Sequence, residues 1–102
     1  MQNIFDTHAH YASRRFDADR DALLGQALPA GGVVGVLECA THSGDCAAVL
    51  ALARTYPYIH AALGIHPASL GEADAPTLAV YQGDWKAELA AIRPLFDDPA
   101  VV

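Results

Sequence analysis

The run VVGVLECA, residues 33–40, most strongly constrains the fold, because Glu38 is its only charged residue. Gly31 and Gly32 come directly before it. A nearly continuous apolar run bounded by glycine is typical of a strand buried on both faces of a parallel sheet. Parallel strands require long crossover connections, usually helices. The run therefore predicts an α/β protein.

Strand-like and helical segments alternate on both sides of this run. We expect strands at about residues 3–8 and 58–65 and helices at about residues 17–28 and 44–56. The sequence PAGG ends the first helix. After residue 68 we expect a loop and then a helix that is interrupted near Gly83 and stops around Pro94, and DDPAVV predicts a turn into a fourth strand. This order favours a parallel sheet with right-handed crossovers.

Composition argues against a disordered chain, a broad nucleic-acid-binding surface and a secreted protein. With 102 residues, 53% of them hydrophobic, we expect one globular domain with a packed core. The net charge of -6 argues against a broad basic surface for nucleic acid. The N-terminus lacks the basic and apolar regions of a signal peptide, and Cys39 and Cys46 form no CxxC pair. These features predict a cytoplasmic protein without membrane association, and they leave its oligomeric state open.

The first expected strand carries a candidate metal site in IFDTHAHY, residues 4–11. Alternate side chains of a strand share a face, so Asp6, His8 and His10 are expected on one side. The Cα atoms of His8 and His10 would be about 6.6 Å apart, which lets both imidazoles reach one ion. An equally good interpretation makes them strand-end histidines bonded to neighbours, with Asp6 capping a turn. Two histidines are in any case fewer than a catalytic metal normally takes.

Other polar residues are weaker candidates. His66 in ALGIHP follows the third expected strand, and Glu38 is a carboxylate inside an apolar strand, which is costly unless it is paired or metal-bound. A histidine bonded to loop backbone is an equally good interpretation of His66. His42 and His60 are interpreted as structural. The cluster of Arg14, Arg15 and Arg20 is interpreted mainly as a solvated surface, with phosphate binding as the alternative.

Several motifs in order give a more specific interpretation. FDTHAHY, RFDADRD, VVGVLECAT and YPYIHAALGIHP resemble the N-terminal part of the TatD family of metal-dependent deoxyribonucleases, closely over residues 4–67. The resemblance implies an α/β fold of the TIM (β/α)8 barrel type. Such a barrel needs about 250 residues. We therefore expect residues 1–102 to supply the first three βα units and the start of the fourth strand of one incomplete domain.

The resemblance also implies site residues and cofactors. His8 and His10 match the family's metal ligands, and His66 matches a residue placed near the substrate phosphate. The implied cofactors are divalent ions, Mg²⁺, Mn²⁺ or Zn²⁺, two of them in a full-length member, and DNA is the implied substrate partner. The ATH at residues 40–42 departs from the family's frequent GTD. The family's remaining ligands have no counterpart here, and we expect a glutamate a few residues beyond Val102.

Three functions follow as hypotheses. The first is a deoxyribonuclease that cleaves phosphodiester bonds with metal-activated water. The second is a hydrolase of a small substrate on the same scaffold, which the net charge mildly favours. The third is a truncated and inactive product. Fold resemblance alone does not choose among them, because function depends on the site.

Overall fold

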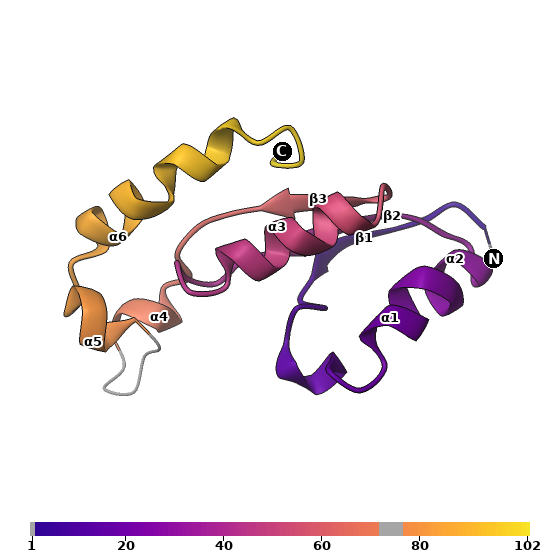
Figure 1. The fold of residues 1–102 in the computed structure, drawn as a ribbon, viewed down its shortest axis with the longest axis horizontal. Coiled ribbons are helices and arrows are strands. Elements are labelled where there is room, and N and C mark those ends of the chain that lie inside the picture. The colour runs from indigo at the N-terminus through magenta and orange to yellow at the C-terminus, as the bar shows by residue number, and fades with distance from the viewer. Residues whose placement is uncertain (1, 72–76) are drawn as a thin grey trace.

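The computed structural model describes residues 2–71 and 77–102. In these ranges β1 (Ile4–Ala9), β2 (Val33–Cys39) and β3 (Ile59–Ala62) form a parallel sheet in the order β1-β2-β3 (Figure 1). The α/β prediction is therefore confirmed. β3 is shorter than predicted, since it ends at Ala62 rather than near Ile65.

The predicted fourth strand is present only as an isolated parallel bridge between Ala61 and Val101. The Ala61 amide donates to the Ala100 carbonyl at 2.8 Å, and the Val102 amide donates to the Ala61 carbonyl at 2.9 Å. This places the end of the chain beside β3. The spatial order of the strands thus follows the chain order, which is the order of a singly wound sheet.

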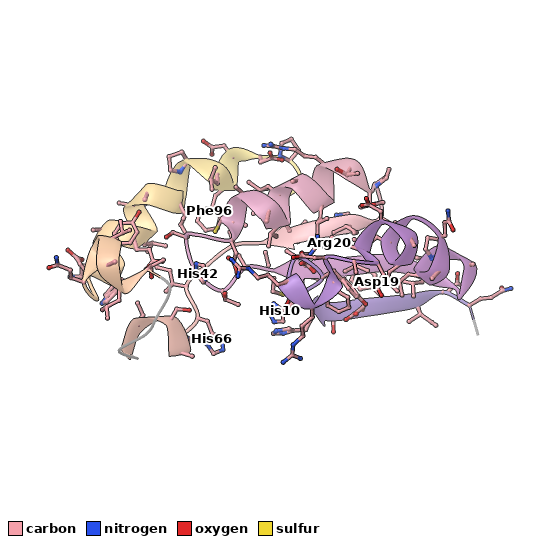
Figure 2. The ribbon with its side chains drawn as sticks, turned by 60° about the horizontal axis from the view of Figure 1, so that its bottom comes forward. His10, Asp19, Arg20, His42, His66 and Phe96 are labelled. Atoms are coloured by element: carbon pink, nitrogen blue, oxygen red, sulfur yellow. The ribbon has the colours of Figure 1, made fainter. Side chains whose placement is uncertain are left out.

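With this strand order, right-handed crossovers put the connecting helices on one face of the sheet. Figure 2 shows helical ribbons above the strands, except for the short helix beside His66, which lies below them. Val36 of β2 lies in the core between sheet and helices, together with Leu24, Val49 and Ile59, and each of these is at most 2% exposed.

The first helical segment differs from its prediction at both ends. It is made of α1 (Arg20–Ala22), the π-helical η2 (Leu23–Ala27) and α2 (Leu28–Ala30), with a 3₁₀ turn η1 (Arg14–Phe16) before it. The predicted start at residue 17 is wrong, and the helix continues through Pro29. Proline can sit there because the residues before it form a π turn, in which the Leu28 amide bonds to the Leu23 carbonyl.

α3 (Cys46–Thr55) follows the spacing of an amphipathic helix. Its buried side chains are Cys46, Val49, Leu50 and Ala53, at positions i, i+3, i+4 and i+7. The helix begins two residues later than predicted. Its residues pack on β3 and β2.

The prediction that β2 is buried on both faces is wrong at its start, where Val34 is 55% exposed. Burial is complete at Val36 and Glu38. On the opposite face the ring of Phe5 covers Gly35, where a Cβ would stand 2.2 Å from a ring carbon. Glycine is therefore required for this close approach.

The last segment contains α4 (Ala68–Gly71), α5 (Leu78–Tyr81), α6 (Trp85–Ile92) and the 3₁₀ helix η3 (Arg93–Asp97). The predicted interruption is confirmed, because Gln82 and Gly83 have φ of 51° and 82°. The loop expected after residue 68 is wrong at its start, where α4 forms, and its next part falls on residues 72–76, outside the described residues. Each helix in the described ranges is too short or too polar to span a bilayer.

Candidate metal centre

The side chains of His8 and His10 converge at the C-terminal end of β1. Their Nε2 atoms are 3.2 Å apart, and their rings meet edge to face with centroids 5.0 Å apart. Two nitrogens bound to one ion at about 2.1 Å, with an angle of about 90–110° between them, would be separated by roughly 3.0–3.4 Å. The observed separation therefore fits two ligands of a single metal ion.

His10 is oriented by the neighbouring strand. Its Nδ1 lies 2.9 Å from the carbonyl oxygen of Cys39, at the end of β2. A carbonyl only accepts hydrogen bonds, so Nδ1 carries the hydrogen and Nε2 keeps its lone pair. A ligand histidine held in this way by its other nitrogen is the usual arrangement at protein metal sites.

Asp6 stabilises the turn after β1 through two hydrogen bonds. One of its oxygens accepts from the His8 amide at 3.2 Å and the other from the Tyr11 hydroxyl at 3.1 Å. Burial, followed by the hydrogen bond to Asp6, raises the pKa of Tyr11 to about 12, so the hydroxyl stays a donor at neutral pH. The turn-capping interpretation of Asp6 thus agrees with its contacts.

Glu38 anchors the same turn from β2. Its side chain is fully buried, and its two oxygens accept from the backbone amides of Tyr11 at 2.8 Å and Ala12 at 2.7 Å. Burial raises the pKa of Glu38, and these two amides and the nearby His10 oppose that rise. Glu38, a weak site candidate in the sequence, is thus paired with backbone amides.

The loop after β2 is shaped by Asp45. Its carboxylate accepts from the Thr41 amide at 3.1 Å, from the Thr41 hydroxyl at 2.7 Å and from the His42 amide at 3.2 Å. His42 in turn accepts the Gly44 amide at Nδ1, at 2.9 Å. The structural role predicted for His42 agrees with these contacts.

His66 is held at the C-terminal side of β3. Its amide donates to the Thr41 carbonyl at 2.7 Å, and its Nδ1 accepts from the Ala68 amide at 3.0 Å. His66 does not join the histidine pair as a third ligand, because no group of three His, Cys, Asp or Glu side chains is placed to hold a metal ion within residues 2–71 and 77–102.

The three arginines have different environments. Arg20 donates to the carbonyls of Tyr11 and Ser13 at 2.7 and 2.8 Å and pairs with Asp17 at 2.7 Å. These bonds fold the loop after β1, so Arg20 has a structural role. Arg14 and Arg15 are exposed in η1. Arg14 lines a cavity of about 640 Å³ between the loops after β1 and β2, together with His10, Thr41 and His42.

The cysteines are not arranged for nucleophilic catalysis. Both are unpaired, and Cys46 is buried whereas Cys39 is half-buried. Burial raises the pKa of both thiols, which disfavours the reactive thiolate.

Over residues 2–71 and 77–102, no group of three or more His, Cys, Asp or Glu side chains is placed to hold a metal ion. The histidine pair by itself offers two ligands, which is fewer than a catalytic metal normally takes. The sequence did not predict the role of the Cys39 carbonyl, because every residue has a backbone carbonyl and its use leaves no mark in the residue type. It also did not predict that Arg14 and His42 line one cavity, because this depends on how the loops after β1 and β2 pack together.

Comparison with known proteins agrees with the site chemistry. A family model described as TatD related DNase matches residues 5–102. The chain is also similar to a curated protein named uncharacterized metal-dependent hydrolase YjjV, from Escherichia coli (strain K12), with 43% identity over 67 residues. That match covers 66% of this chain and 26% of the relative. The chain therefore matches about a quarter of the relative's length.

Proposed function

Because this chain belongs to the TatD-related DNase family, we propose that it forms the N-terminal part of a metal-dependent hydrolase of the TIM-barrel type that cleaves DNA phosphodiester bonds. The convergence of His8 and His10 Nε2 at 3.2 Å carries this proposal. Their place at the C-terminal end of β1 supports it, because active sites of (β/α) barrels lie at this face. The chain order of the strands and the Val101 bridge beside β3 support the barrel.

Each residue has a defined task in this proposal. His8 and His10 hold a divalent ion, Mg²⁺, Mn²⁺ or Zn²⁺, through Nε2. The Cys39 carbonyl keeps the His10 proton on Nδ1, so that Nε2 faces the ion. When bound, the ion supplies Lewis acidity and lowers the pKa of bound water. A second ion, further ligands and the cytoplasmic location expected from the sequence remain predictions.

The histidine pair is tested by metal binding rather than by activity. His8→Ala and His10→Ala, each measured by calorimetric titration with Zn²⁺ and Mn²⁺, should lose metal binding. His60→Ala serves as the control, because His60 is a half-buried histidine in the middle of the β3 sequence. Equal metal affinity in wild type and both variants would refute the assignment.

His66 is proposed to bind the substrate phosphate and not the metal. The family match supports this role, and so does the absence of His66 from any group of three potential metal ligands in the described residues. His66→Ala should leave the metal affinity unchanged and should raise KM or lower kcat in any chain that is active. Loss of metal binding in this variant would make His66 a ligand instead.

The substrate class is tested by activity. Hydrolysis of single-stranded DNA with added Mg²⁺ or Mn²⁺ is compared with hydrolysis of small phosphate esters. The net charge of -6 is the observation that favours the small-substrate alternative, since it repels a polyanion. Metal-dependent activity on esters alone would establish that alternative, and activity on neither substrate would support an inactive fragment.

A further inference from the structure

The cavity between the loops after β1 and β2 is lined by polar side chains that the proposed metal site does not use. It measures about 640 Å³, and its lining includes Arg14, Thr41, His42 and Asp45 as well as His10. His10 therefore contributes both to the candidate metal centre and to this cavity. A group bound in the cavity would lie directly beside the histidine pair.

The acidic side chains of the lining are already occupied by donors. Glu38 accepts the Tyr11 and Ala12 amides. Asp45 accepts the Thr41 amide and hydroxyl and the His42 amide. A carboxylate saturated by N–H and O–H donors presents fewer lone pairs to a ligand, and these bonds disperse its charge. The two carboxylates thus hold the loops after β1 and β2 in place.

Two further side chains of the lining, His42 and Arg14, carry N–H donors. The Nδ1 atom of His42 accepts the Gly44 amide, so the neutral ring carries its hydrogen on Nε2. Arg14 is always protonated and has five N–H donors that match the oxygens of a phosphate. Arg14 is exposed, and His42 is half-buried, so both remain accessible to a ligand.

We propose that this cavity is a binding subsite for a phosphate group, held by Arg14 and by His42 Nε2–H next to the His8–His10 pair. This subsite adds detail to the function proposed above. It rests on that function only for the statement that the bound phosphate belongs to the substrate. In a nucleotide chain it would take a phosphate that neighbours the bond being cleaved. Phosphate binding itself requires no metal.

The test is an NMR titration of the metal-free chain, in EDTA, with inorganic phosphate at constant pH and constant ionic strength. The imidazole Cε1–H resonances of His42 and His10 should shift along a saturable curve. Arg14→Gln should weaken phosphate binding by roughly five- to tenfold, as expected for one charge-assisted hydrogen bond at an accessible site. Arg15→Gln is the matched control, because Arg15 is exposed in the same 3₁₀ turn and does not line the cavity.

Failure of the subsite and failure of the metal centre give different results. His8→Ala, which removes a metal ligand outside the cavity lining, should keep the phosphate affinity of the wild type. Shifts that do not saturate, or equal weakening by Arg14→Gln and Arg15→Gln, would overturn the subsite while the metal titration is unaffected. Loss of phosphate binding in His8→Ala would likewise contradict it.

Discussion

At the scale of single residues, two buried glutamates hold backbone amides of distant loops. Glu38 binds the Tyr11 and Ala12 amides, and Glu88 of α6 accepts the Ser43 amide at 2.9 Å. Both side chains are at most 1% exposed. Glu38 differs from Glu88 because its partners directly follow His10, so it helps to fix the candidate metal ligands.

We expect Glu38→Gln to weaken metal binding about tenfold, the usual effect of losing an outer partner of a ligand. Glutamine keeps one acceptor oxygen but turns an NH₂ donor towards a backbone amide. Calorimetric titration with Zn²⁺ gives the dissociation constant. Glu88→Gln is the control, since it should lose similar stability and keep the metal affinity of the wild type. Unchanged affinity in Glu38→Gln would show that Glu38 has only a structural role.

At the scale of elements, the π turn of η2 leaves the Leu24 carbonyl without a hydrogen-bond donor from the helix backbone. The Leu28 amide bonds to Leu23, and Pro29 has no amide hydrogen, so the Leu24 carbonyl has neither of its helical donors. The Tyr58 hydroxyl donates to this carbonyl at 2.6 Å. A side chain directly before β3 thus allows Pro29 to lie inside the helical segment.

Tyr58→Phe should therefore lower the free energy of unfolding by about 1–2 kcal/mol, because it leaves a part-buried carbonyl without a donor. Urea unfolding followed by circular dichroism measures the change. Tyr56→Phe is the matched control, because the Tyr56 hydroxyl bonds to Asp21 at an exposed position. An equal loss in both variants would argue against a special role for the Leu24 carbonyl.

The last segment of the chain is attached to α3 by an ion pair. Arg54 donates to Asp98 at 2.9 Å through Nε and also through Nη2, and Asp98 accepts the Ala100 amide at 2.9 Å. The Ala100 amide and then Arg54 lower the pKa of Asp98 below its ordinary value of 3.8. A lowered folded-state pKa stabilises the fold above the unfolded-state pKa and loses this effect as the pH falls through the folded-state value.

Asp98→Asn should thus be less stable than the wild type at pH 7, and the difference should shrink as the pH falls below about 4. Thermal unfolding at a series of pH values gives the comparison. Asp97→Asn removes the same charge from the exposed neighbouring residue and should change stability little at any pH. A difference between Asp98→Asn and wild type that is constant with pH would contradict the ion pair.

At the scale of the whole molecule, one face of the sheet is left uncovered by the helices of residues 2–71 and 77–102. Phe5 lies over Gly35 on this face and is 51% exposed. In a closed barrel the face opposite the helices is the interior, which is filled by side chains. The exposed ring is therefore consistent with the proposal that further βα units complete the fold.

We expect the 102-residue chain to self-associate through this face as its concentration rises. Sedimentation velocity should show species heavier than a monomer, and Phe5→Thr should reduce them. Val80→Thr is the control, because Val80 is 72% exposed on α5, away from the sheet. A monomer at every concentration that unfolds cooperatively would contradict the incomplete barrel. Reading the coding sequence past codon 102 for a glutamate-bearing strand tests the same proposal directly.

The sequence by itself determined the order of strands and helices. The periodicity of apolar residues and the breaking of elements by Gly or Pro are local effects that act within a few residues. It also determined that His8 and His10 share a strand end. Only the tertiary structure decided the partners: the Cys39 carbonyl for His10, the Tyr11 and Ala12 amides for Glu38, and the Tyr58 hydroxyl that lets a helix pass Pro29. These contacts join segments 26 to 34 residues apart. Local pattern carries no information about them, since they depend on which backbone groups the packing of strands and helices leaves within reach.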